Sequence, residues 1–183
     1  DITYKNKQKR EEHLNVIIEE TDRLNLLVGD ILTLSKLQAK SDILELEEFD
    51  LIKEIDAIVK RYVYLKDMEG YDITVPKEGM IKADRKKINQ VIYNLVNNAI
   101  NYTGEDKKVY ITVTEEKKDY LVEIKDTGKG IDVAEIDYIW DKYYKNDKNH
   151  KRNIVGTGLG LSIVKNILVT HGFMFGVKSA KNK

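Results

Sequence analysis

A glycine-rich run is the part of this sequence best suited to chemistry. It reads Gly-Thr-Gly-Leu-Gly-Leu-Ser over 156–162 and leads into an apolar stretch, 161–171, that predicts a helix. Backbone N–H groups exposed at the start of a helix bind phosphate. A P-loop would need Lys followed by Ser or Thr after the last glycine, and a dinucleotide fingerprint would need glycine where the chain has Leu161. The run therefore predicts a phosphate-binding loop of another kind.

Amide side chains are aligned along a second predicted helix, 84–102, for which Asp84 is a suitable N-cap. Four of them fall on one line of this helix: Gln90, Asn94, Asn98 and Asn101. Asparagine is unfavourable inside a helix, and a solvent-facing surface more usually carries Lys and Glu. The line indicates oxygen ligands for a hard cation such as Mg²⁺, with phosphates completing its shell. A plain polar face is the alternative.

Asp126 ends a predicted strand and is followed by Gly128 and Gly130. A carboxylate at the start of a tight turn can accept a hydrogen bond from an exocyclic amine, and the glycines let a flat ring lie against the backbone. The alternative is a hairpin turn in which the aspartate satisfies its own turn amides.

A basic loop, 142–152, carries five Lys or Arg residues beside aromatic side chains and leads into the glycine-rich run. It predicts a mobile lid whose cations reach a polyphosphate, with a simple solvated loop as the alternative. Nucleic-acid binding is disfavoured, because the chain has 31 acidic and 31 basic residues and no net charge.

The composition sets the broad class of the protein. The 183 residues include no cysteine, which excludes disulfides and thiolate metal sites and fits a reducing compartment. No apolar run approaches the ~18 residues of a membrane helix, and no signal peptide opens the chain.

Residues 5–40 are predicted to form one long helix that builds a bundle. A 3-4 spacing typical of such a seam links Leu14, Ile17, Thr21, Leu24, Val28, Ile31 and Ser35. The apolar stripe is widened by Ile18, Leu27, Leu32 and Leu34, which favours a bundle of more than two helices.

The rest of the chain mixes strands and helices. We expect strands at 44–51, at 71–75 and 80–83 around a Pro76/Gly79 turn, at 108–114 and 120–126 as a hairpin, and at 173–179. We expect helices over 51–67, 84–102, 161–171 and, in a short form, 132–139. This order predicts an α+β two-layer sandwich with a largely antiparallel sheet, preceded by a helical arm.

Four motifs together resemble the catalytic core of bacterial two-component sensor histidine kinases. The segments 94–102, 126–130, 139–145 and 156–161 are similar to the family's N, G1, F and G2 boxes, in that order. The first helix, with Arg23-Leu24 and 34–37, resembles the second helix of the family's dimerisation domain. The resemblance implies a Bergerat-type ATP-binding fold over 43–183, preceded by a partial dimerisation domain over 1–42.

The resemblance also implies a role for each matching residue. Asp126 would read the adenine amino group, Asn98 would hold Mg²⁺ with Asn94 close by, and Tyr102 would pack near the adenine or ribose. Lid cations near the phosphates would be Lys145, Lys151 and Arg152. Catalytic roles would fall to Lys145 and Arg152, together with Asn94 and Asn98. The rest of the ATP pocket would comprise Asn101, Gly128, Gly130, Ile131, Gly156, Thr157, Gly158, Leu159, Gly160 and Leu161.

The amide at Asn94 favours a kinase over a hydrolase. Related gyrase-type ATPases carry a glutamate there that activates water, and an amide cannot act as a general base. Phosphoryl transfer relies mostly on positioning and charge neutralisation. The resemblance therefore implies a histidine kinase that uses ATP and Mg²⁺ and phosphorylates a response-regulator receiver domain by way of a histidine. It also implies a homodimer and the cytoplasmic portion of a membrane-anchored bacterial sensor.

The sequence departs from the family at three places. No His-Glu-x-x-x-Pro motif is present, and His13 is expected to be a structural or surface residue. Asn101 stands where the family often has lysine, and the chain stops short of the family's final strand. We therefore expect a fragment that binds nucleotide without phosphorylating itself. The alternatives are a nucleotide-binding or dimerisation module without transfer activity and an anti-sigma-type serine kinase, which would have no need of the long helix.

Overall fold

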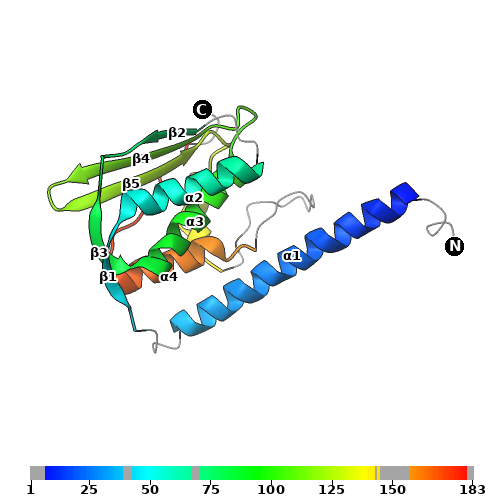
Figure 1. Ribbon diagram of the computed structural model, residues 1–183, viewed down its shortest axis with the longest axis horizontal. Coiled ribbons are helices and arrows are strands. Elements are labelled where there is room, and N and C mark those ends of the chain that lie inside the picture. The colour runs from blue at the N-terminus through cyan, green and yellow to red at the C-terminus, as the bar shows by residue number, and fades with distance from the viewer. Residues whose placement is uncertain (1–6, 39–42, 67–70, 143, 145–156, 181–183) are drawn as a thin grey trace.

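The N-terminal region folds as one long helix, α1 (Lys7–Gln38), which passes one side of an α/β body and extends well beyond it (Figure 1). The structure is a computed structural model that describes residues 7–38, 43–66, 71–142, 144 and 157–180. The body contains β1 (Leu46–Asp50), α2 (Leu51–Lys66), β2 (Tyr71–Thr74), β3 (Met80–Asp84), α3 (Arg85–Tyr102), β4 (Val109–Glu116), β5 (Asp119–Asp126), the 3₁₀ turns η2 (Val133–Glu135) and η3 (Tyr138–Trp140), and α4 (Gly160–His171).

The strands form two small sheets. In one, β1 pairs antiparallel with β3, so that Phe49 lies opposite Ile81. The other has the order β2-β4-β5, with β4 and β5 as the predicted antiparallel hairpin and β2 parallel to β4. The prediction of a largely antiparallel sheet is therefore right for β1–β3 and β4–β5 and wrong for β2–β4. The strands β2 and β3 flank the Pro76/Gly79 segment without pairing with each other.

Helices α2, α3 and α4 cover one face of the strands, which gives the predicted two-layer α+β sandwich (Figure 1). Helix α3 carries its buried side chains at a 3-4 spacing: Ile88, Val91, Ile92, Val96 and Ala99. Most of them pack with α2 and with the inward-facing residues Val109, Ile111 and Val113 of β4 in the main core. Burial of this stripe fixes the rotation of α3 and so decides which way its amide side chains face.

Asp84 holds the start of α3. The Asp84 carboxylate accepts from the Lys87 N–H (3.1 Å), as expected of an N-cap, and from the Glu45 N–H (3.2 Å). The Asp84 N–H in turn donates to Nε2 of His171 (3.1 Å), whose Nδ1 lies 2.8 Å from the Ile167 carbonyl oxygen. The start of α3 is thereby tied to the end of α4.

A second core joins α1 to the body. It comprises Leu34 of α1, Val91 of α3, and Leu159, Ile163, Val164 and Ile167 of the α4 region, with Leu27 packed against it. Part of the stripe that the sequence assigned to a helical bundle therefore faces the body instead. Among the described residues, no helix is long and apolar enough to span a membrane.

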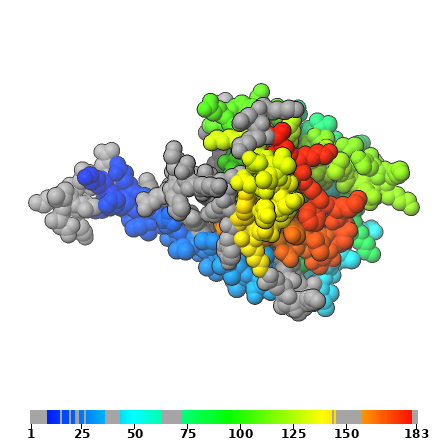
Figure 2. All heavy atoms as spheres, turned by 180° about the vertical axis from the view of Figure 1, so that it is seen from behind, coloured from blue at the N-terminus to red at the C-terminus, as the bar shows by residue number. Residues whose placement is uncertain are grey.

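Two sequence predictions in the C-terminal half need correction. Residues 132–139 form two separate 3₁₀ turns instead of one short helix. The predicted strand at 173–179 is wrong, because the structure assigns no strand to 173–180. Side chains tether this segment in place of a backbone ladder: the Phe175 ring lies edge-on to Trp140, 4.9 Å between centroids, and Ser179 Oγ accepts from the Ile131 N–H (2.8 Å). Figure 2 shows the η2–η3 segment lying over α4 and the C-terminal residues.

Candidate nucleotide-binding site

The asparagine-rich face of α3 meets the start of α4. A Cβ built on Gly160 would lie 3.7 Å from Cγ and Oδ1 of Asn94, which is an ordinary contact distance. The half-buried Asn94 side chain has its Nδ2 buried without a hydrogen-bond partner among the described residues. A buried amide without a partner costs free energy unless a ligand or water satisfies it. Two motifs that lie 66 positions apart are thus brought together around an unsatisfied polar group.

The first turn of α4 is open. No side-chain hydrogen bond caps its N-terminus at Leu159, so the first backbone N–H groups are available to an anion. Gly158 has φ of 74°, a conformation that other residues adopt at a cost. The glycine-rich run therefore aims backbone donors at a position beside Asn94.

Asp126 lies at the end of β5, exposed, and its carboxylate serves the turn that follows. Oδ1 accepts from the Gly128 N–H (2.8 Å), while Oδ2 has no hydrogen bond with any described residue. Gly128 is required by packing, because a Cβ there would overlap the carbonyl oxygen of Tyr102. The two sequence interpretations of Asp126 are therefore compatible, since one oxygen holds the turn while the other can accept from a ligand.

Helix α1 contributes a charged group to the edge of the site. Thr157 Oγ1 donates to Oδ2 of Asp30 (2.6 Å) and accepts from the Leu159 N–H (3.2 Å). Burial raises the pKa of the Asp30 carboxyl above its usual value, and the hydrogen bond from Thr157 only partly offsets this effect. When ionised, Asp30 places negative charge next to the loop that faces phosphate.

The other predicted site residues fall into two groups. Asn98, Asn101, Gly130, Ile131, Gly160 and Leu161 are half-buried, Leu159 is buried, and Tyr102 is 46% exposed at the end of α3. Asn98 makes no hydrogen bond with any described residue, which leaves its amide available. The predicted lid residues Lys145, Lys151 and Arg152, together with Gly156, lie outside the described residues.

The amide oxygens fit Mg²⁺ only in combination with phosphate. Among the described residues, no cluster of three histidine, aspartate or glutamate side chains could hold a metal ion. A hard cation at α3 would therefore take one or two ligands from Asn98 and Asn94 and the rest from phosphate oxygens and water, as Mg²⁺ does in nucleotide sites.

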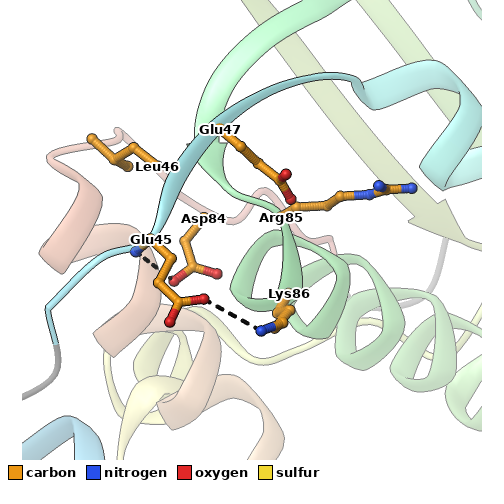
Figure 3. A pocket seen from close by; sticks show the side chains of 6 residues that line it. All are labelled: Glu45, Leu46, Glu47, Asp84, Arg85 and Lys86. Carbon is orange, nitrogen blue, oxygen red and sulfur yellow. Dashed lines mark hydrogen bonds and ion pairs between the residues drawn. The ribbon is translucent and has the colours of Figure 1, made fainter.

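A depression of about 310 Å³ lies elsewhere, between β1 and the start of α3 (Figure 3). Its lining carries charges of both signs, from Glu45 and Glu47 to Arg85 and Lys86. Glu45 pairs with Lys86 (3.3 Å), and Asp84 is engaged in capping α3. These groups are satisfied within the protein, so the depression does not compete with the α3–α4 junction as a ligand site.

Several residues at the site were missed from the sequence. Asp30 was part of no motif, because its contact with Thr157 crosses 127 positions. Asp106 and Thr103, which contact Thr127 beside Asp126, belong to none of the motifs. A local pattern of polar residues after a helix is the only signal that could have drawn attention to them.

Residues 83–183 match the profile described as "Histidine kinase-, DNA gyrase B-, and HSP90-like ATPase". The match covers more than half of the chain and includes both halves of the α3–α4 junction. The chain belongs to this ATPase family. Within it, the chain is 33% identical over 174 residues to the signal transduction histidine-protein kinase ArlS of Staphylococcus epidermidis, a match that covers 94% of this chain and 38% of that protein.

Solved structures agree with this family assignment. Full-length ShkA in complex with AMPPNP has a TM-score of 0.76 at 22% identity, over 96% of this chain and 37% of that one. The histidine kinase ThkA in complex with the response regulator TrrA has a TM-score of 0.62 at 26% identity, over 76% of this chain and 42% of that one. The chain spans less than half the length of ArlS, ShkA and ThkA.

Proposed function

We propose that the chain binds Mg-ATP and donates the γ-phosphoryl group to a histidine outside these 183 residues, for relay to a response-regulator aspartate. The observation that carries this proposal is the buried amide of Asn94, which lacks a partner among the described residues and lies against the open first turn of α4. The atom without a partner is Nδ2, a hydrogen-bond donor, so the junction offers side-chain and backbone donors to an anion at the same place.

Each part of the site has one task in this proposal. Asp126 accepts from the adenine amino group, Asn98 with Asn94 holds Mg²⁺, and the backbone after Gly158 cradles the phosphates. Bound Mg²⁺ neutralises charge on the phosphates. Asn94 supplies no general base for water, so the phosphoryl group is left for an imidazole nitrogen. The cations of 145–152 would neutralise charge on the phosphates.

The arrangement of α1 supports a place in a dimeric sensor. Its exposed apolar side chains would pair with a second copy, and the body would lie on the cytoplasmic side of a membrane-anchored bacterial sensor. Docking of α1 beside the phosphate loop, through Leu34 and Asp30, gives the long helix a role that an anti-sigma-type serine kinase would lack.

A calorimetric titration with ATP, with and without Mg²⁺, tests the binding part of the proposal, with GTP as the control for the base. We expect saturable binding that prefers adenine. Asp126→Ala should remove most of that preference, because a hydrogen bond to a charged acceptor is worth about 1.5–3 kcal/mol. Asn98→Ala should weaken binding far more in the presence of Mg²⁺ than in its absence, and equal losses would refute its role as a ligand.

Transfer is tested by adding a separate protein that carries the first dimerisation helix of a sensor kinase with its histidine. Label from γ-labelled ATP that appears on this histidine supports the kinase. Nucleotide binding without any transfer would favour the alternative, a nucleotide-binding or dimerisation module.

A further inference from the structure

The loop between α3 and β4, residues 103–108, lies directly against the turn that follows Asp126. A Cβ on Gly104 would come within 2.7 Å of the Thr127 carbonyl oxygen, so the two backbones touch. Thr103 Oγ1 lies 3.0 Å from Thr127 Oγ1. The 103–108 loop precedes the turn after Asp126 by about twenty positions in the sequence and belongs to none of the four motifs.

The Thr127 hydroxyl donates its proton to the Asp106 carboxylate, a charged and therefore stronger acceptor than the Lys108 carbonyl oxygen, which lies 3.4 Å away. The same carboxylate oxygen accepts from the Lys108 N–H (3.3 Å). A hydroxyl has one proton to give. Once Thr127 has given it to Asp106, its oxygen can only accept, and the Gly104 N–H lies 3.4 Å away as a donor. The neighbouring Thr103 hydroxyl donates to the Lys108 carbonyl oxygen (2.8 Å). Asp106 therefore fixes the direction in which the Thr127 hydroxyl donates.

The carboxylate is a dependable acceptor. The hydrogen bond from Thr127 lowers the pKa of Asp106 below its usual value, burial opposes this, and the N–H and charge of Lys108 add to the lowering. Asp106 is thus ionised throughout the neutral range. A charge-assisted hydrogen bond of this kind is stronger and more directional than one between neutral groups.

The hydrogen bond from Thr127 to Asp106 matters because Thr127 lies between Asp126 and Gly128, the two residues that shape the proposed adenine site. Asp126 is held by the Gly128 N–H, and Gly128 is packed without clearance against Tyr102. A shift of Thr127 would therefore move Asp126 relative to the end of α3. We propose that Asp106 is a positioning residue for base recognition, acting through the Thr127 hydroxyl. The proposal rests on the proposed role of Asp126 in binding adenine.

Calorimetry on three variants of the chain tests the carboxylate. Asp106→Ala should weaken Mg-ATP binding about 5- to 10-fold and reduce the preference for ATP over GTP, since a hydrogen bond to a charged group is lost. Asp106→Asn keeps an acceptor oxygen and should restore most of the affinity. Glu105→Ala removes an exposed carboxylate from the same loop and is the matched control, with affinity unchanged.

The hydroxyl is tested in parallel. Thr127→Val should reproduce the loss of Mg-ATP affinity seen with Asp106→Ala, whereas Thr127→Ser should retain the affinity. The double variant Asp106→Ala/Thr127→Val should bind Mg-ATP no more weakly than the weaker-binding of the two single variants. These pairs keep the test decisive if Asp106→Ala does not fold. If the unaltered chain binds no ATP, the proposed function fails. If it binds ATP and Asp106→Ala matches Glu105→Ala, only the positioning role is overturned.

Discussion

At the scale of single residues, the site is defined by polar atoms that have no hydrogen-bond partner among the described residues. Nδ2 of Asn94 is buried without a partner among the described residues, although most buried polar groups in proteins are paired. The exposed Asp126 carboxylate keeps one oxygen that no described residue engages. Gly160 differs from Gly128 in one respect. Packing within the protein would admit a methyl group at Gly160 but excludes one at Gly128. Gly160 is thus open to close approach by a ligand, whereas Gly128 serves the turn.

Gly128→Ala is expected to impair nucleotide binding, because its methyl group would collide with the Tyr102 carbonyl and displace Asp126. We expect ATP affinity to fall at least about tenfold, since misplacing a recognition group by about an ångström is costly. Calorimetry measures the change. Gly176→Ala is the control, because no atom lies within 4 Å of its added Cβ. Equal affinities in the two variants would contradict the packing argument.

At the scale of elements, a polar contact joins the start of α3 to the end of α4. The Asp84 carboxylate caps α3 and accepts from the Glu45 N–H at the start of β1. The Asp84 N–H donates to Nε2 of His171 at the end of α4. Burial opposes ionisation of Asp84, yet the N–H groups of Lys87 and Glu45 and the charge of Lys87 outweigh it, so its pKa lies below the usual value. Ionised Asp84 therefore stabilises the folded state.

The contribution of Asp84 should depend on pH. Because its folded pKa is lowered, the stabilisation is present above the unfolded pKa of about 3.9 and is lost as pH falls through the lower, folded pKa. Asp84→Ala should cost about 1–2 kcal/mol at pH 7 in urea unfolding, and the difference should shrink in acid. Asp56→Ala, which removes an exposed pair with Lys60, is the control and should cost less than about 0.5 kcal/mol.

Docking of α1 should show the opposite pH dependence. The pKa of Asp30 is raised by burial, so the docked arrangement favours the protonated form and weakens as pH rises through that pKa. The chain has no cysteine, so Gly29→Cys and Lys165→Cys allow spin labels to report the distance between α1 and α4. We expect the docked fraction to rise as the pH falls below neutral and Asp30 becomes protonated. Asp30→Asn should abolish this dependence, and a variant that still responds would contradict it.

At the scale of the whole molecule, α1 has two apolar sides with different fates. Leu27 and Leu34 contact the body, whereas eight others are between 48% and 60% exposed: Leu14, Val16, Ile17, Ile18, Leu24, Val28, Ile31 and Leu32. A row of this length on one helix is typical of an interface rather than of a solvated surface. The docked side and the open side allow α1 to hold the body while it pairs with a second helix.

The open side predicts self-association. Leu24→Glu together with Ile31→Glu should shift sedimentation from dimer to monomer, because each buried leucine or isoleucine contributes about 1.5–3 kcal/mol. Asn25→Glu adds the same charge to an exposed position beside Leu24 and should leave the dimer unchanged. A monomer at high concentration in the unaltered chain would remove the basis for the homodimer.

The sequence by itself determined what depends on local spacing. The cap at Asp84, the 3-4 stripe of α3, the β4–β5 hairpin and the helix after the glycine-rich run are encoded by neighbouring residues, and each is confirmed. The order of four motifs also sufficed to identify the family. Periodicity failed at 173–179, because an extended apolar segment becomes a strand only if a neighbouring strand offers it a backbone ladder.

Only the tertiary structure decided which residues meet. The parallel pairing of β2 with β4, the contact of Asn94 with Gly160, the hydrogen bond of Thr157 to Asp30 and the brace of Asp106 on Thr127 all join distant positions. Such contacts are set by how the buried faces of α1, α3 and α4 rotate to fill shared cores. Local sequence fixes the face that each helix buries, but the partner across that face follows from packing of the entire chain.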